Sequence, residues 1–254
     1  MIFDSHSHYD DQAFNDDRDL LLSTLKEKNV GNIICVGAEW SSFEKIKAMC
    51  SKYPFAYAAL GIHPENALDL TMERRSIFKD IIADIKPVAI GEIGLDYHYD
   101  EPSKEIQREA FIYQLKLARE VDLPVIIHSR DAAEETMDII KEYMPPKKGV
   151  IHCFSSSLAI ANQYIDMGFT IGIGGVVTFK NGKKLKEVAA NIPLSSILLE
   201  TDCPYMAPEP FRGTRNDSSL ISYVAAEIAS LRGISPEEVI SETEKNTKRL
   251  FNIE

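Results

Sequence analysis

Short apolar runs rich in β-branched residues alternate along the chain with longer segments whose apolar residues recur at helical spacing. Eight of these runs have the length and composition of buried strands: Ile2–His8, Asn32–Ala38, Ala56–His63, Val88–Asp96, Pro124–Ser129, Gly149–Phe154, Thr170–Phe179 and Ile197–Asp202. Each gap between them is long enough for a crossover helix, as a parallel sheet requires. The pattern predicts an α/β fold, a (β/α)8 TIM barrel that forms a single domain over residues 1–254.

Signals at helix ends agree with this pattern. Three pairs of residues are predicted to cap the starts of helices: Ser41 with Glu44, Asp131 with Glu134, and Ser235 with Glu238. Gly168 and Gly233 follow helical patterns, where a left-handed residue ends a helix well. A doubly wound open sheet is the alternative fold, but no Gly-x-Gly-x-x-Gly motif follows the first strand.

The charge balance limits the kinds of partner that the chain can bind. Lysine and arginine number 28 against 39 acidic residues, which gives a net charge of −11. A protein that follows many phosphates along a duplex carries a basic surface, so this composition disfavours broad electrostatic binding of nucleic acid. Bound cations can still supply the local positive charge that a phosphate group needs.

Several absences bear on location. No uncharged stretch approaches the ~20 apolar residues that cross a bilayer, and the N-terminus lacks the basic region of a signal peptide. The four cysteines form no Cys-x-x-Cys pair, which indicates unpaired thiols in a reducing compartment. We therefore expect a soluble, cytoplasmic protein with no membrane partner, and no pattern implies a protein partner.

The first strand contains the most suggestive polar residues. Side chains alternate along a strand, so His6 and His8 project from one face and can reach a single cation. A His-x-His pair is by itself a weak signal, because two surface or core histidines would give the same pattern.

Other polar residues stand at or near the ends of later apolar strands: His63, Glu92, His128, His152 and Asp202. A carboxylate such as Glu92 in an otherwise uncharged strand is costly unless it is protonated, paired or bound to a cation. Barrel enzymes build their sites at the carboxyl ends of the strands. Each residue alone could be a satisfied core residue, but the whole set predicts a metal site.

The ligand types suit zinc, manganese or magnesium, with no thiolate required. Cys153 and Cys203 flank candidate ligands, but strand alternation predicts that they point away as buried structural thiols. Four histidines and two carboxylates exceed the usual protein ligands of one catalytic zinc. They suit two divalent metal ions about 3.5–4 Å apart that a carboxylate bridges.

Five segments, taken in order, resemble the TatD family of metal-dependent deoxyribonucleases, which have an amidohydrolase-type barrel. They are Asp-Ser-His-Ser-His at 4–8, Gly-Glu-Ile-Gly-Leu-Asp-Tyr at 91–97, His-Ser-Arg-Asp-Ala at 128–132, His-Cys-Phe-Ser at 152–155 and Leu-Glu-Thr-Asp-Cys-Pro at 199–204. The resemblance implies one metal held by His6, His8, Glu92 and Asp202, and another held by Glu92, His128 and His152.

The resemblance further implies phosphodiester hydrolysis of DNA by a metal-activated water, often from a 3′ end. Asp202 and Glu92 are then the catalytic carboxylates, with Asp202 accepting the proton of the water. The net charge of −11 favours a small footprint, so DNA ends or short oligonucleotides are the expected substrates.

Four residues are candidates for substrate binding. Arg130, Arg212 and Arg215 carry the planar fork that binds phosphate bidentately, and His63 is a candidate donor to the substrate phosphate. A solvated side chain or a salt bridge is the alternative for the loop arginines. Three positions in these regions depart from the family pattern: Ser156, Phe211 and Thr214.

Two other functions fit the same residues. Amidohydrolase-type barrels also cleave amides and esters, so a metal-dependent deacylase, for example one acting on aminoacyl-tRNA, is the first alternative. A metal-stabilised binding protein without turnover is the second, although a complete ligand set with an apparent proton acceptor argues against it.

Overall fold

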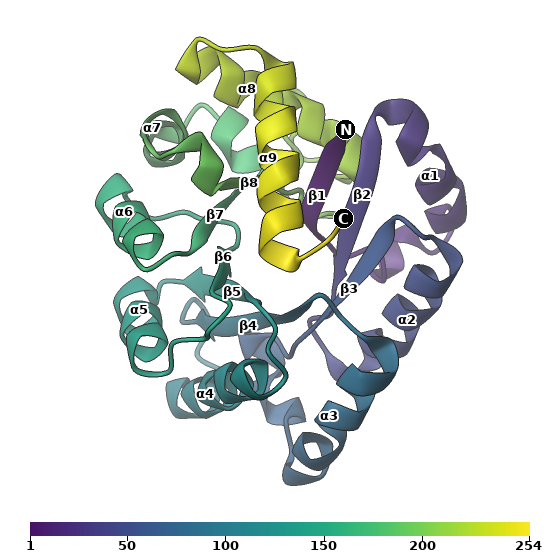
Figure 1. Cartoon of the computed structure of the whole chain (residues 1–254), viewed down its shortest axis with the longest axis vertical. Coiled ribbons are helices and arrows are strands. Elements are labelled where there is room, and N and C mark those ends of the chain that lie inside the picture. Colours follow the sequence, from purple (N-terminus) through teal and green to yellow (C-terminus); the bar gives the residue numbers. More distant parts are fainter. The chain divides into compact units, whose positions relative to one another are not determined.

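The computed structural model describes residues 1–254 (Figure 1). Its strands are β1 (Ile2–Ser7), β2 (Val30–Val36), β3 (Ala56–Leu60), β4 (Ala89–Asp96), β5 (Val125–Arg130), β6 (Gly149–Ile151), β7 (Thr170–Ile173) and β8 (Ile197–Leu199). They form one eight-stranded sheet in the order β1 to β8. This order, with parallel pairing and helices between the strands, confirms the predicted (β/α)8 barrel.

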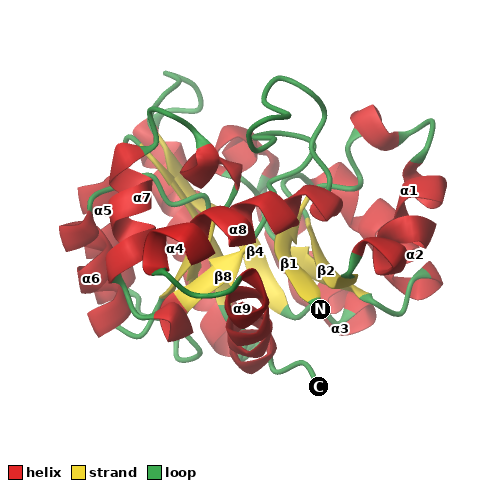
Figure 2. Cartoon of the chain, turned by 90° about the horizontal axis from the view of Figure 1, so that it is seen from above, coloured by secondary structure: helices red, strands yellow, loops and turns green.

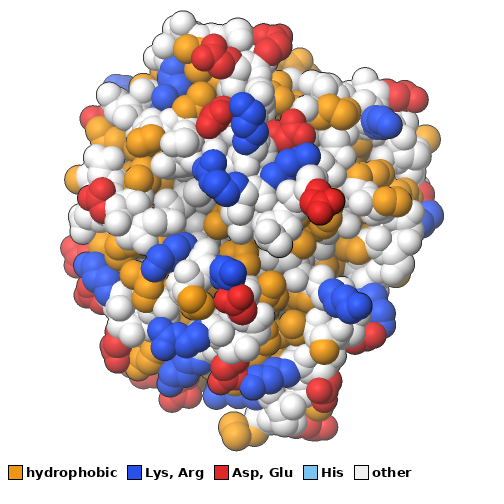
Figure 3. Space-filling model, viewed as in Figure 1, with side chains coloured by type: hydrophobic (Ala, Val, Ile, Leu, Met, Phe, Trp, Pro, Cys, Tyr) orange, Lys and Arg blue, Asp and Glu red, His pale blue; other side chains and the backbone are white.

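Nine α-helices accompany the sheet. They are α1 (Arg18–Thr24), α2 (Phe43–Lys52), α3 (Met72–Ile85), α4 (Lys104–Glu120), α5 (Ala133–Glu142), α6 (Leu158–Asp166), α7 (Lys183–Asn191), α8 (Ile221–Arg232) and α9 (Pro236–Phe251). None of them combines the length and the apolar composition that a membrane span needs. On the face shown in Figure 3, basic side chains are interspersed with acidic ones, so this face presents no continuous basic track.

Contacts group the residues into two compact units. Unit 1 comprises residues 1–35 and 153–254, and unit 2 comprises residues 36–152. We describe each unit by itself, and one domain over the whole chain stays a prediction.

Unit 1 holds both chain termini and the neighbouring strands β1 and β8. Ser7 forms a parallel bridge with Cys203, which places the last strand of the sheet beside the first. Helix α9 packs against β1 and β8, and the view from above in Figure 2 shows it near the N-terminus. Asn246 of α9 is buried, and its amide donates to the carbonyls of Leu194 and Ile197, each at 2.9 Å. These hydrogen bonds therefore attach α9 to the start of β8.

Unit 2 contains β3 to β6 and the helices α2 to α5. All eight residues of β4 are buried, as expected for a strand of a parallel sheet that is covered on both faces. The polar exceptions in that strand are Glu92 and Asp96, and both have buried side chains. Helix α4 contacts β4, and its Ala110 and Leu117 are buried.

Four strands are shorter than their apolar runs predict by three residues or more: β3, β6, β7 and β8. Part of the backbone beyond these strands bonds to side chains. Ile62, for example, donates to Gln114 Oε1 at 2.8 Å and accepts from Gln114 Nε2 at 3.0 Å. After β7 the chain turns into a short 3-10 helix, Gly175–Thr178. The predictions that His8, His63, His152 and Asp202 lie inside strands are therefore wrong, and these residues lie in the segments that follow.

The helix caps were predicted with mixed success. Ser235 accepts from the Glu238 amide at 3.1 Å, with proline at the start of α9, which confirms this cap. Gly233 ends α8 with φ +66°, as predicted. The prediction for Ser41 is wrong, because a 3-10 turn precedes α2 and the Ser41 hydroxyl donates to Glu39. The prediction for Asp131 is also wrong, because α5 begins at Ala133 without a side-chain cap.

We expect Asn246→Ala to lower the free energy of unfolding by about 2–4 kcal/mol, because it leaves two buried carbonyls without their donors. Urea denaturation followed by circular dichroism measures the change. Asn191→Ala is the matched control, since its exposed amide donates to the Glu187 carbonyl at 2.7 Å within one helix. Equal denaturation midpoints for the two variants would show that the α9 contact contributes nothing.

Candidate metal centre

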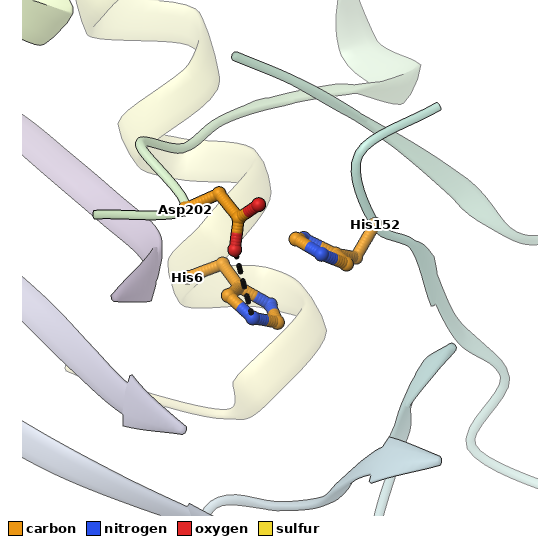
Figure 4. A group of neighbouring side chains, drawn as sticks. All are labelled: His6, His152 and Asp202. Carbon is orange, nitrogen blue, oxygen red and sulfur yellow. Dashed lines mark ion pairs between the residues drawn. The ribbon is translucent and has the colours of Figure 1, made fainter. Parts of the chain in front are cut away.

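The first group of candidate ligands lies in unit 1 and consists of His6, His8 and Asp202, which we call the His6 cluster. The Nε2 atoms of the two histidines are 3.0 Å apart. Asp202 Oδ1 lies 3.9 Å from His6 Nε2 and 3.5 Å from His8 Nε2, and Figure 4 shows the His6–Asp202 pair. Two imidazoles and one carboxylate that converge in this way can hold a divalent cation.

Backbone bonds between the end of β1 and the segment after β8 position this cluster. The amide of Asp202 donates to the His6 carbonyl at 3.0 Å, and the amide of His8 donates to the Cys203 carbonyl at 2.9 Å. Asp202 itself has φ +59°, a left-handed conformation that aspartate adopts more readily than most non-glycine residues. The turn at Asp202 therefore directs its carboxylate to the histidines of β1.

Asp4 also belongs to β1, and its side chain stabilises the strand that carries His6. Its buried carboxylate accepts from the hydroxyls of Thr201 at 2.7 Å and Ser218 at 2.6 Å, and from the amide of His6 at 3.1 Å. Burial raises the pKa of Asp4 to about 7, although the hydrogen bonds act in the opposite direction. Asp4 therefore fixes β1 against the segment after β8, and its oxygens are occupied by these bonds.

The second group lies in unit 2 around Glu92, and we call it the Glu92 cluster. Its members are Glu92, His63, His128 and His152. Glu92 Oε1 lies 2.9 Å from His128 Nδ1, 3.4 Å from His152 Nε2 and 3.7 Å from His63 Nε2. The carboxylate is 4% exposed, so three imidazoles surround an anion that water barely reaches. The donor atoms of Glu92, His63 and His128 all lie within 4.8 Å of one another, close enough to share a metal ion.

Asp96 orients one histidine of this cluster, and the sequence reasoning missed it. His128 Nε2 lies 3.1 Å from Asp96 Oδ2, while its Nδ1 faces Glu92. Burial disfavours the charged ring, but the bonds to Asp96 and Glu92 outweigh it and raise the pKa of His128 to about 10. A carboxylate on the far nitrogen of a histidine is the usual partner of a metal-ligating imidazole. The available signal was a second carboxylate, four residues after Glu92, in the same apolar strand.

Glu200 is the second residue that the sequence reasoning missed. It is buried in unit 1, and its Oε1 accepts from the Cys153 amide at 2.6 Å. Any side chain at Gly172 would overlap the Glu200 carboxylate, so the glycine makes room for it. Cys153 has φ +45° and directly follows His152 in the chain. Glu200 therefore stabilises the turn that follows a candidate ligand.

The predicted substrate arginines lie in different electrostatic settings. Arg215 donates to both carboxylate oxygens of Asp17, at 2.8 and 2.6 Å. The Arg212 guanidinium lies over the Phe179 ring, 4.4 Å from its centroid, and no acidic partner contacts it. Arg130 is 44% exposed and its Nη1 lies 3.9 Å from Asp96 Oδ2. Of the two loop arginines of unit 1, Arg212 is therefore the one that no carboxylate neutralises.

The donor set of both clusters consists of imidazole nitrogens and carboxylate oxygens. No thiolate takes part: Cys203 is fully buried, and burial raises the pKa of its thiol well above the usual value. None of the four cysteines forms a disulfide, as expected. This chemistry fits zinc, manganese or magnesium, and it fits a hydrolytic site in which a carboxylate can take a proton.

Comparisons with known proteins agree with the fold and with the donor set. The sequence profile of the TatD related DNase family matches residues 3–252. The metal-dependent hydrolase YabD of Bacillus subtilis is 44% identical over 100% of both chains. The metal-dependent hydrolase YjjV of Escherichia coli is 37% identical over 99% of this chain and 98% of its own.

A solved structure extends the likeness to three dimensions. The crystal structure of Escherichia coli YjjV, a TatD homologue, matches with a TM-score of 0.94 at 35% identity. The match covers 100% of this chain and 98% of YjjV. The chain therefore belongs to the TatD related DNase family, and it is a metal-dependent hydrolase of that family.

Proposed function

We propose that the chain hydrolyses phosphodiester bonds at the ends of DNA strands, in the 3′ to 5′ direction. The observation that carries the proposal is the His6 cluster, where two imidazoles and the Asp202 carboxylate converge within 3.9 Å. The TatD resemblance supplies the substrate class. The expected cofactors are two divalent metal ions, zinc, manganese or magnesium.

In this proposal each cluster contributes to metal binding. His6, His8, Glu92 and Asp202 hold one ion, and Glu92, His128 and His152 hold the other, as the resemblance implies. Bound cations lower the pKa of water and offset the negative charge that develops on a phosphoryl group. Asp202 takes the proton of the attacking water, and its turn at φ +59° keeps the carboxylate in place for this step.

The charges of two predicted substrate arginines suit a small anionic substrate. Arg212 is exposed and unpaired with acid, and Arg130 is half-exposed, so both can donate to a phosphate. His63 is the third proposed donor to the phosphate, and its Nε2 lies 3.7 Å from Glu92 Oε1. A role of Arg215 in substrate binding stays a prediction, because its guanidinium already pairs with the Asp17 carboxylate.

The net charge of −11 leaves few cations for a long binding track. The proposed substrates are accordingly DNA ends and short oligonucleotides, with no membrane and no protein partner. Four cysteines without a disulfide support a reducing compartment, and we propose the cytoplasm.

The direct test supplies metal-reconstituted protein with three substrates side by side. We expect hydrolysis of an end-labelled linear single strand, because a small footprint needs a free end. A covalently closed circular strand of the same sequence should resist. An aminoacyl ester tests the deacylase alternative. Rapid cutting of the circle would overturn the end-directed mode, and turnover of the ester without cleavage of DNA would favour the deacylase.

Asp202 and Glu92 should respond differently to loss of negative charge. Asp202→Asn keeps a coordinating oxygen but cannot accept a proton, so activity should fall by at least ~10²–10⁴ even at saturating metal. Glu92→Gln removes the charge that offsets repulsion between two dications, so it should chiefly reduce metal occupancy. Excess metal should then restore part of the rate of Glu92→Gln only.

A metal titration of the hydrolysis rate, with bound metal measured alongside, separates the two variants. If Asp202→Asn regains the wild-type rate at saturating metal, Asp202 is only a ligand and another group takes the proton.

Asp96→Asn should weaken metal binding about 10- to 100-fold, because it removes the charged partner of His128. Competition with a chromogenic chelator measures this affinity. Asp131→Asn is the matched control, since its exposed carboxylate lies 3.4 Å from His98 on the surface. Unchanged metal affinity in Asp96→Asn would mean that Asp96 does not orient a ligand.

A further inference from the structure

A shallow hollow lies on the surface of unit 1 beside Asp202. It is lined by Asp11, Gln12, Asn15, Tyr205, Thr214 and Arg215, among others. The amide of Tyr205 donates to the Asp202 carbonyl at 2.9 Å, so the hollow begins one turn of chain from the candidate proton acceptor. The metal ligands proposed above do not line it.

Tyr205 is the large side chain of this hollow and is held firmly in spite of its exposure. The residue is 55% exposed, yet its hydroxyl donates to Asp11 Oδ2 at 3.2 Å. Its carbonyl accepts from the Asn216 amide group at 2.7 Å, and Asn216 is buried and also donates to the Thr201 carbonyl. An exposed aromatic ring that is fixed at both ends offers a flat apolar face without the entropic cost of ordering it.

The charges of the hollow disfavour a phosphate group. Asp11 and Asp16 contribute carboxylates. The single cation of the lining, Arg215, is paired with both oxygens of Asp17 and also donates to the Ala13 carbonyl at 2.7 Å. An uncharged ligand therefore fits better than an anionic one.

Amide groups give the hollow a hydrogen-bonding edge. Asn15 lines the hollow, and its Oδ1 accepts from Arg18 at 2.9 Å, so its amide group is the part that can donate to a ligand. Gln12 is exposed on the same wall and carries both a donor and an acceptor. A ligand with a flat ring and a polar edge, as a nucleobase has, matches the aromatic face and the amides together.

We infer that this hollow is a subsite for the 3′-terminal nucleobase of a single strand, with Tyr205 as the stacking platform. The inference rests on the proposed function, because it names the part of the DNA that lies next to the reacting phosphate. Stacking on an aromatic ring tolerates every base, so the subsite recognises a strand end without reading its sequence.

The test uses metal-loaded protein and a short single strand that carries 2-aminopurine as its 3′-terminal base and a phosphorothioate at the terminal linkage to slow hydrolysis. Stacking on Tyr205 should quench the 2-aminopurine fluorescence. Tyr205→Phe keeps the ring and should keep the quenching. Tyr205→Ala should abolish it and weaken binding roughly 5- to 100-fold.

Two controls isolate the ring of Tyr205. Tyr223→Ala removes another exposed tyrosine of unit 1, which packs on Phe211 and does not line the hollow, and it should retain the quenching. A strand whose terminal residue is abasic should bind wild type and Tyr205→Ala equally, because neither complex contains the stacked pair.

The outcomes distinguish this inference from the function on which it rests. If wild type degrades linear DNA but quenching and affinity are the same in Tyr205→Ala, the subsite is overturned and the nuclease stands. Loss of quenching in Tyr223→Ala would also overturn it, since the signal would not come from Tyr205. If the loaded protein neither binds nor cuts any single strand, the nuclease fails and the subsite with it.

Discussion

The burial of the Glu92 carboxylate is the constraint on which the metal centre depends. A carboxylate that is 4% exposed loses most of its hydration, and that loss is large unless cationic or donor groups replace the water. In unit 2, three imidazole rings have a nitrogen within 3.7 Å of Glu92 Oε1. Because His128 also bonds to Asp96, its ring cannot rotate away, and the whole arrangement is held ready for a cation.

In unit 1, buried carboxylates are compensated by hydrogen bonds from the backbone. Asp4 and Glu200 are buried carboxylates, and each accepts hydrogen bonds from backbone amides, Asp4 from His6 and Thr201 and Glu200 from Cys153. Each of them stands two residues before a candidate ligand, His6 or Asp202. In the pairs Asp4–His6 and Glu200–Asp202, the buried carboxylate fixes the chain, and the candidate ligand two residues later is then held in one orientation. Rigid support of this kind is what positions a catalytic group.

The sequence predicts the strands of this fold better than their ends or the supporting carboxylates. The apolar runs predicted all eight strands, because a strand of a parallel sheet buries both faces and its run is nearly continuous. The ends of the strands escaped prediction, since Gln114 bonds to Ile62 across 52 residues and no local pattern records that contact. Asp96 and Glu200 were missed for a related reason. A carboxylate in an apolar run looks the same whether it binds a metal or orients a neighbour.

The arginines show why composition alone could not locate the phosphate contacts. Arg212 and Arg215 are three residues apart, and each guanidinium lies over an aromatic ring, Arg212 over Phe179 and Arg215 over Phe14. An aromatic face holds a guanidinium without cancelling its charge, whereas a carboxylate cancels it. Arg215 also pairs with the Asp17 carboxylate, so the two arginines differ in the charge that remains for an anion. Composition counts them as equal cations, and only the position of Asp17 in the fold separates them.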